Sequence, residues 1–307
     1  MKKIILIFFI AFSVMAPRLS AGAGDSHWLV SPEWLNEHIN DENLIVVDVS
    51  LSYQDYRKEH IPNSVYIDWL VDLANKNEKV HYEMVPKEDF GAFMRRIGAQ
   101  RDSTLVFYDN FQNRLAIRAL FVTDYYGHQK TAVLDGGYTS WKQAGLPLSS
   151  DIPNVEASNY TVDEIHPELV VDTEYIEWNL RNRDVIFVDS RPWEMYTGQA
   201  VGIMVNTGKE VARRGHLPGA ISLPWEKSLN PQDRFKDADT LMAMFDQHGL
   251  KKDTHTIVFY CNEGVHGVFN WFVATKILRF SNVKVYEGSM GNWAEDQLRP
   301  MVTGIGF

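Results

Sequence analysis

Cysteine is the scarcest residue of this sequence, because Cys261 is the only one among 307 residues. A single thiol cannot form a disulfide within the chain, so the fold does not depend on one. No Cys-x-x-Cys or His-x-x-x-His pair is present, which removes the spacing typical of metal sites. Cys261, His216 and His266 could still supply metal ligands as a minor alternative. We expect neither a metal nor another cofactor.

Positive charge is also in deficit. Lys and Arg number 30 against 40 Asp and Glu, giving a formal net charge of −10. An acidic surface argues against nucleic acid or an anionic membrane as a partner. It leaves room for a small anionic substrate, because the local charge at a site can oppose the net charge.

Long hydrophobic runs are absent beyond the start of the chain, so no later segment resembles a membrane helix. Residues 1–23 combine Lys2 and Lys3, a short apolar stretch over 4–16 and a small-residue site at 21–23. This pattern predicts a cleaved secretory signal peptide and a periplasmic or secreted protein with no membrane contact after cleavage. Cleavage removes three basic residues and no acid, which changes the net charge from −10 to −13.

The two halves of the chain resemble each other. Four ordered pairs of segments match, and the last two pairs share a spacing of 152 residues: 44–50 with 185–191, 60–64 with 216–220, 105–109 with 257–261, and 135–141 with 287–293. Four matches in one order indicate an internal duplication.

Each half alternates short apolar strands with helical patterns. Strands are predicted at 44–47, 65–67, 104–108 and 132–134, and again at 185–188, 220–223, 256–260 and 283–286. Amphipathic helices are predicted between them, for example at 173–180 and 238–248. Alternation of this kind indicates an α/β fold with a mainly parallel sheet flanked by helices in each domain. We predict a first domain over 24–148, a polar linker over 149–168 and a second domain over 169–307.

The segment from 256 to 278 organises the second domain. A predicted strand at 256–260 leads into a polar loop, and an apolar stripe typical of a helix follows (Val265, Val268, Phe269, Phe272, Val273 and Ile277). Cys261 is the first residue of that loop. The loop N–H groups and the start of the helix favour a thiolate there, and Gly264 and Gly267 allow the backbone to curl.

Cys261 could instead be a small buried hydrophobe, but a packing cysteine belongs inside a strand or helix. Its position at the carboxyl end of a predicted strand favours a reactive thiol. The corresponding residue of the first half is Asp109, which cannot act as a sulfur nucleophile. We expect Asp109 to cap a helix or hold a loop, and its replacement by alanine to leave catalysis nearly unchanged.

Four segments of the second half resemble the motifs of the rhodanese family of sulfurtransferases in its tandem two-domain form. They are residues 189–191 with Tyr196, residues 215–220, residues 261–267, and residues 287–288 with Trp293. The resemblance covers nearly all of the chain after residue 23. It implies two tandem rhodanese-like domains, of which the second is catalytic and the first is inactive.

The resemblance also implies a persulfide mechanism. Cys261 would take a sulfane sulfur from a small donor such as thiosulfate or 3-mercaptopyruvate. A thiophilic acceptor, either cyanide, a thiol or a protein cysteine, would then remove it. The substrate and persulfide would be held by the loop residues Asn262, Glu263, Gly264, Val265, His266 and Gly267.

Three positions depart from the family pattern. Glu263 would repel a dianion and raise the pKa of the thiol if it faced the pocket, but we favour a solvent-facing acid in the first helical turn. His266 could donate a hydrogen bond to the leaving group or to the persulfide, or it could charge near pH 6–7; a surface histidine is the other interpretation, and both remain open. Met195 stands where many members carry a donor-binding arginine, and Arg213 or Arg214 could supply that charge instead.

Supporting roles are expected for four residues of the second half. Asp189 and Arg191 would pair to fix a loop, His216 would brace the chain before the next strand, and Arg214 would lie near the donor.

Two other functions rival sulfur transfer. The related cysteine phosphatases need an arginine after five spacer residues, and Gly267 occupies that position here, which argues against phosphatase activity. A non-catalytic exported module that binds or carries sulfur is the stronger rival. Whether a small donor adds sulfur to Cys261 separates that rival from the enzyme.

Overall fold

The computed structural model describes residues 28–75, 84–204, 207–252 and 254–305. The predicted signal peptide at 1–23 lies outside these ranges, so export stays a prediction. Within the described ranges, no helix is both long and apolar enough to cross a membrane.

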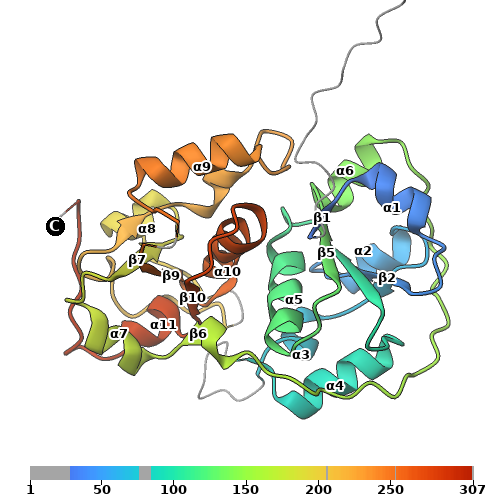
Figure 1. The fold of residues 1–307 in the computed structure, drawn as a ribbon, viewed down its shortest axis with the longest axis horizontal. Coiled ribbons are helices and arrows are strands. Elements are labelled where there is room, and N and C mark those ends of the chain that lie inside the picture. The colour runs from blue at the N-terminus through green and yellow to red at the C-terminus, as the bar shows by residue number, and fades with distance from the viewer. Residues whose placement is uncertain (1–27, 76–83, 205–206, 253, 306–307) are drawn as a thin grey trace, which may run out of the picture.

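Each half of the chain forms one five-stranded sheet whose strands all run parallel (Figure 1). The first sheet has the order β1-β5-β4-β2-β3, and the second repeats it as β6-β10-β9-β7-β8. The first five strands are β1 (Leu29–Val30), β2 (Leu44–Asp48), β3 (Val65–Tyr66), β4 (Thr104–Tyr108) and β5 (Thr131–Leu134). The second five are β6 (Val170–Val171), β7 (Val185–Asp189), β8 (Ile221–Ser222), β9 (Thr256–Tyr260) and β10 (Val283–Tyr286). The predicted α/β fold with parallel sheets is confirmed.

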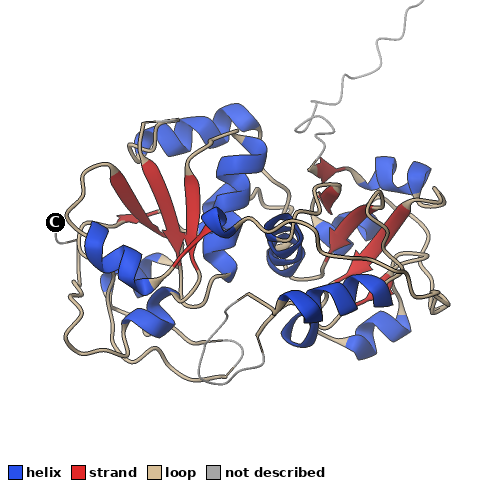
Figure 2. Ribbon diagram, turned by 60° about the horizontal axis from the view of Figure 1, so that its bottom comes forward, coloured by secondary structure: helices blue, strands red, loops and turns tan. Residues whose placement is uncertain are grey.

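Helices cover both faces of each sheet (Figure 2). The first domain contains α1 (Pro32–His38), α2 (Tyr53–Lys58), α3 (Trp69–Asp72), α4 (Lys87–Arg96), α5 (Arg114–Tyr125) and α6 (Gly137–Gln143). The second contains α7 (Thr173–Asn179), α8 (Trp193–Thr197), α9 (Ala238–Gln247), α10 (Val265–Phe272) and α11 (Ser289–Trp293). Short 3-10 turns lie at η1 (Pro167–Leu169) and η2 (Trp225–Ser228), and a π-helical turn, η3 (Val273–Ile277), continues α10.

The central strands are buried on both faces, as parallel strands between helical layers must be. On β9, Ile257 and Phe259 face a core shared by the two domains, whereas Val258 and Tyr260 face a core against α7 and α11. This alternation explains the continuous apolar runs in the sequence. The eight predicted strands are present, with the edge strands β3 and β8 reduced to two residues each. The two-residue strands β1 and β6 were not predicted, since two residues show no periodicity.

The two domains share one hydrophobic core between α5 and α10, which lie side by side between the two sheets (Figure 1). Phe121 of α5 meets Trp271 of α10 edge to face, with 4.8 Å between ring centroids. At one end of the pair, Lys276 Nζ lies 3.0 Å from Asp124 Oδ2. All six apolar residues of the predicted stripe belong to this core, which confirms the stripe.

Residues 149–166, most of the predicted linker, contain no helix or strand. Tyr160 in this segment is nevertheless buried in the shared core, and its carbonyl accepts a hydrogen bond from Arg95. The segment is therefore packed along the first domain rather than held away from it. The two sheets lie within the predicted domain ranges, and the exact boundaries stay predictions.

Candidate active site

Cys261 follows β9 directly, at the carboxyl end of the second sheet, and α10 begins four residues later. Its side chain is 1% exposed. Gly264 has a φ of +89°, a left-handed conformation that glycine adopts without strain. Gly267 has a different role: a Cβ there would lie 3.2 Å from Tyr260 Cα, so the missing side chain lets α10 approach β9.

Backbone N–H groups of the loop converge on the sulfur. The amide nitrogens of Gly264 and Glu263 donate to Sγ of Cys261 at 3.1 and 3.4 Å. Behind the loop, the Cys261 amide donates to Ser289 Oγ at 3.1 Å, and the Met290 amide donates to the Cys261 carbonyl at 3.0 Å. These contacts hold the sulfur in a cradle of donors suited to a sulfur-centred anion.

The pKa of Cys261 is shifted in the direction opposite to the one predicted from the sequence. Burial raises the pKa of the Cys261 thiol above its ordinary value, and the Glu263 carboxylate adds to the rise. The N–H groups of Glu263, Gly267 and His266 act in the opposite direction without overcoming burial. The prediction that this position favours the thiolate is therefore wrong for the free protein.

Glu263 faces inward. It is 4% exposed and lines the pocket in front of Cys261, so the favoured solvent-facing alternative is wrong. Glu263 belongs to the loop before α10 rather than to the helix itself, and residues of both domains enclose that loop. The charge of Glu263 therefore acts on the thiol directly.

His266 is not a surface residue either, since it lies in the pocket with its ring stacked on Trp225 at 5.1 Å between centroids. Its Nε2 lies 3.3 Å from Nη1 of Arg114. A guanidinium can only donate, so Nε2 accepts and the ring is neutral. Burial, with the added repulsion of Arg114 and Arg191, lowers the pKa of His266 to about 3. The open alternative of a charge near pH 6–7 is thereby excluded.

The pocket in front of Cys261 is small, with a volume of about 40 Å³. Both domains build it. The first domain supplies Leu51, Trp69, Phe111, Arg114 and Leu115, and the second supplies Ile203, Cys261, Asn262, Glu263, Val265 and His266. None of the first-domain residues was predicted, because a sequence does not tell which helices pack against each other.

Arg114 brings positive charge to this pocket. Its guanidinium lies over the ring of Phe111, 3.3 Å from the centroid, and over that of Trp225 at 4.9 Å. Burial lowers the pKa of Arg114 from its very high ordinary value, which leaves the side chain charged. Arg114 stands 152 residues before His266, the spacing of the internal repeat, so repeat-related positions meet at the pocket.

Asp109 holds the first-domain wall of the pocket in place. Its buried carboxylate accepts hydrogen bonds from the amides of four residues at the start of α5: Phe111, Asn113, Leu115 and Ala116. The predicted capping role is confirmed. The loop that Asp109 fixes carries Phe111 and Arg114, so the expectation that its loss leaves catalysis unchanged does not follow from this geometry.

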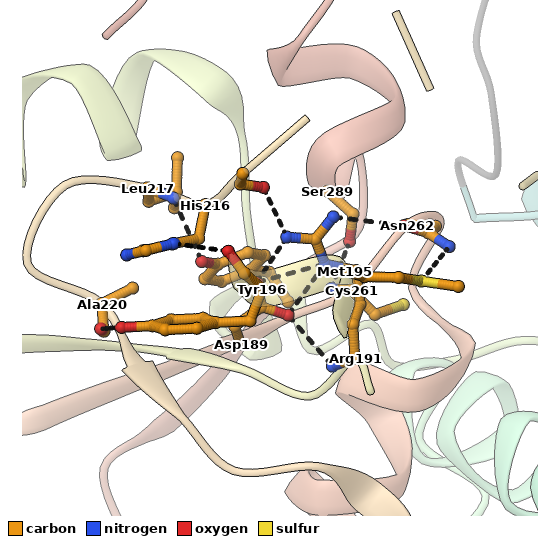
Figure 3. A network of polar contacts seen from close by, with 12 residues as sticks. Asp189, Arg191, Met195, Tyr196, His216, Leu217, Ala220, Cys261, Asn262 and Ser289 are labelled. Atoms are coloured by element: carbon orange, nitrogen blue, oxygen red, sulfur yellow. Dashed lines mark hydrogen bonds and ion pairs between the residues drawn. The ribbon is translucent and has the colours of Figure 1, made fainter. Parts of the chain in front are cut away.

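Arg191 and Asp189 form the predicted pair beneath the loop (Figure 3). Nε and Nη2 of Arg191 reach the two carboxylate oxygens at 2.9 and 2.6 Å. The remaining contacts of the guanidinium go to the Gly215 carbonyl at 2.7 Å and to Oδ1 of Asn262 at 3.5 Å. Through Asn262 the pair positions the residue next to Cys261.

His216 braces the chain as predicted. Its Nδ1 donates to the Tyr196 carbonyl at 2.7 Å, and the two rings stack with 3.6 Å between centroids (Figure 3). Its backbone pairs with Val302 through a β-bridge. His216 is thus a framework residue, buried below the loop.

Arg213 and Arg214 lie elsewhere. Arg213 binds four backbone carbonyls of the C-terminal segment, those of Trp293, Ala294, Asp296 and Arg299. Arg214 is exposed and donates to the Gln199 carbonyl at 2.9 Å. Neither lines the Cys261 pocket, where Arg114 supplies the charge instead. Met195 contacts Asn262 Nδ2 through its sulfur at 3.7 Å.

A buried ion pair between the domains supports the loop from behind. Arg118 Nη1 of α5 lies 2.5 Å from Glu287 Oε1, and both side chains are at most 9% exposed. If Gly264 carried a Cβ, that atom would lie 3.7 Å from Arg118 Nη1. The ion pair therefore lies directly behind the cysteine loop. Among the described residues, no three His, Cys, Asp or Glu side chains gather as a metal site.

Comparison with known proteins agrees with this arrangement. The rhodanese-like domain family matches residues 31–144 and again residues 172–296. The chain therefore belongs to the rhodanese family. With two such domains in one chain, it is a member of the tandem rhodanese sulfurtransferases, as the sequence resemblance indicated.

Individual relatives match over most of their length. The "Sulfur carrier protein TtuD" of Thermus thermophilus is 31% identical over 268 residues, which span 86% of this chain and 93% of the relative. A protein of Saccharopolyspora erythraea named "Putative thiosulfate sulfurtransferase" is 29% identical over 87% of this chain and 92% of its own. The crystal structure of YnjE superposes with a TM-score of 0.78 at 25% identity, covering 90% of this chain and 68% of YnjE.

Proposed function

We propose that this protein moves a sulfane sulfur from a small donor to a thiophilic acceptor through a persulfide on Cys261. The observation that carries the proposal is the position of the sulfur, which lies under two converging N–H groups at the base of a pocket. Membership of the rhodanese sulfurtransferases supports sulfur transfer in general.

In the first step, the Cys261 thiol loses its proton to solvent and the thiolate attacks the outer sulfur of the donor. With thiosulfate, the S–S bond breaks and sulfite leaves with the electron pair. With 3-mercaptopyruvate, the C–S bond breaks and pyruvate leaves as its enolate, which then takes up a proton. Cys261 retains the added sulfur as a persulfide anion, which the N–H groups of Glu263 and Gly264 are placed to stabilise.

In the second step, the acceptor attacks the terminal sulfur of the persulfide. The S–S bond breaks, the Cys261 thiolate leaves, and cyanide becomes thiocyanate or a thiol becomes a persulfide. The thiolate then regains a proton or attacks a new donor. His266 does not accept the thiol proton at Nε2 in this scheme, because Arg114 donates to that atom.

The charges in the pocket bear on the donor. Thiosulfate carries two negative charges and 3-mercaptopyruvate carries one. Glu263 opposes a second negative charge near the sulfur, whereas Arg114 favours one anionic group. We therefore expect 3-mercaptopyruvate to be the better of the two donors.

A sulfur-carrying role without turnover is the second candidate. The name of the Thermus thermophilus relative favours it, since that protein is called a sulfur carrier. In that case a protein thiol would be the acceptor, and small acceptors would release the sulfur slowly.

The test is steady-state thiocyanate formation with cyanide and each donor, in the wild type and in Cys261→Ser. The wild type should turn over with a higher kcat/KM for 3-mercaptopyruvate, and Cys261→Ser should show only background with an unchanged circular dichroism spectrum. Turnover retained in Cys261→Ser would refute the proposal that transfer proceeds through Cys261. A persulfide that forms on the wild type but does not pass its sulfur to cyanide would indicate the sulfur-carrying role without turnover.

A further inference from the structure

The first domain repeats the framework that holds Arg191 in the second. His60 Nδ1 donates to the Tyr56 carbonyl at 2.6 Å with the rings stacked at 4.1 Å, as His216 does with Tyr196 at 2.7 and 3.6 Å. The Tyr56 hydroxyl donates to a backbone carbonyl at 2.7 Å, and the Tyr196 hydroxyl does so at 2.8 Å. The polar scaffold at this edge of the sheet is thus conserved between the repeats.

The strand positions of the two buried aspartates also correspond. Asp48 ends β2 opposite Tyr108 of β4, and Asp189 ends β7 opposite Tyr260 of β9. Two residues further on, the second domain has Arg191 where the first has Ser50. The first domain therefore keeps the aspartate that binds the arginine in the second domain, but it has no guanidinium at the equivalent chain position.

The groups that contact the Arg191 guanidinium have counterparts around a cavity of about 370 Å³ in the first domain. Asp48 corresponds to Asp189. Glu59 precedes His60 as Gly215 precedes His216, and Asn110 follows Asp109 as Asn262 follows Cys261. Asp48, Glu59 and Asn110 all line the cavity, together with Ser50. The counterparts of the residues that contact the Arg191 guanidinium therefore line one cavity in the first domain.

Asp48 itself is 3% exposed. Its Oδ1 accepts from the Ser50 amide at 2.7 Å, as Asp189 Oδ1 accepts from the Arg191 amide at 3.0 Å. Within the described part of the chain, no cationic side chain forms an ion pair with Asp48. Burial raises the pKa of Asp48, against the hydrogen bonds of Ser50 and Tyr108. A buried carboxylate without a cationic partner is costly, and a bound cation would relieve that cost.

The rest of the lining consists of Asp55, Tyr56, Lys58 and Tyr138, and the Lys58 ammonium is paired with Asp55. The ring residues Tyr56 and Tyr138 line the cavity, and guanidinium groups stack on aromatic faces. At its rim, Asp55 and Glu59 are held in exposed ion pairs with Lys58 and Lys142. Exposed pairs of this kind contribute little stability, so the two carboxylates can turn to a ligand at low cost.

We propose that this cavity binds a guanidinium group supplied from outside, in the place that Arg191 fills in the second domain. The group can belong to a free guanidino compound or to an arginine side chain of another protein. This site is separate from Cys261, and its existence does not depend on the proposed sulfur transfer.

The test is isothermal titration of the full chain with agmatine and with 1,4-diaminobutane, a diamine of matched length that lacks the guanidinium. Agmatine should bind at one site, at least about tenfold more tightly than the diamine, because only the planar fork matches the carboxylate. An acetyl-Gly-Arg-Gly-amide peptide, compared with its lysine analogue, distinguishes the two sources. Absence of agmatine binding, or equal binding of the diamine, would overturn the proposal.

Two variants check the location. Ser50→Arg should place a side chain in the cavity and abolish agmatine binding, whereas Gln143→Arg, which adds the same charge on the exposed face of α6, should leave it unchanged. Asp48→Asn should weaken agmatine at least about tenfold, and it keeps the test decisive if Ser50→Arg does not fold. Agmatine binding at wild-type strength in folded Ser50→Arg or in Asp48→Asn would contradict the assignment.

Discussion

At the scale of single residues, the reactivity of Cys261 is a balance between burial and hydrogen bonding. Burial and the Glu263 carboxylate raise the pKa of the thiol, and the loop N–H groups lower it. Since the thiolate is the nucleophile, the sulfur should become more reactive as the pH rises above the ordinary thiol range. The free protein is therefore expected to hold Cys261 largely as the thiol at neutral pH.

Glu263→Gln tests this balance. Removing the carboxylate charge lowers the pKa of the thiol, so the pH profile of Cys261 alkylation by iodoacetamide should move to lower pH. The rate of alkylation at neutral pH should rise several-fold. The kcat/KM for thiosulfate should rise relative to that for 3-mercaptopyruvate. Glu263→Asp, which keeps the charge, serves as the control. A profile that stays in place, or moves to higher pH, would show that Glu263 does not act on the sulfur.

Sequence reasoning identified Cys261, Gly264 and the Asp189–Arg191 pair because their chemistry is local to a strand, a loop and a helix start. It misplaced Glu263 because the pattern put this acid in a first helical turn, where acids usually face solvent, whereas α10 begins only at Val265. The burial of Glu263 depends on residues of the other domain that line the same pocket, which no local pattern contains. The position of Arg114 in the pocket could not be predicted for the same reason, because Arg114 comes from the other domain.

At the scale of elements, the loop between β4 and α5 is a wall of the candidate active site rather than a remnant of the duplication. Asp109 stands where the second domain has Cys261 and accepts four backbone hydrogen bonds, which fixes Phe111 and Arg114 against the pocket. The sequence predicted the capping role, because aspartate before a helix is a common cap. It did not predict that the capped loop faces Cys261.

Asp109→Ala should therefore impair both stability and catalysis. Loss of the cap is expected to cost about 2–4 kcal/mol of the free energy of unfolding, measured by urea denaturation. Turnover should fall several-fold as Arg114 and Phe111 lose their fixed positions. Asp102→Ala, at an exposed aspartate of the same domain, is the control. If Asp109→Ala behaves like that control, the loop does not depend on its carboxylate.

At the scale of the whole molecule, the duplication produces one candidate active site from two domains. The repeat predicted two similar domains, each with a mainly parallel sheet, and this was correct; the structure adds that the two sheets share one strand order. Their mutual arrangement could not be predicted, because which faces of α5 and α10 meet depends on side-chain packing along the entire interface. The shared core and the Arg118–Glu287 pair join the domains directly behind the cysteine loop.

A double-mutant cycle measures the strength of that connection. Arg118→Met or Glu287→Met alone should each lower the free energy of unfolding by about 3–5 kcal/mol, because each leaves a buried charge without its partner. The double variant should be far less destabilised than the sum of the two singles. Lys58→Ala, which breaks an exposed pair, should change little. Additive losses in the double variant would mean that the two charges do not stabilise each other.

The central claim is that Cys261 carries the transferred sulfur, and the most direct test is the intact mass of the reduced protein after incubation with each donor. The account predicts a gain of about 32 Da, one sulfur atom, that disappears on adding cyanide and does not form in Cys261→Ser. No gain with either donor, or a cyanide-sensitive gain that persists in Cys261→Ser, would contradict it.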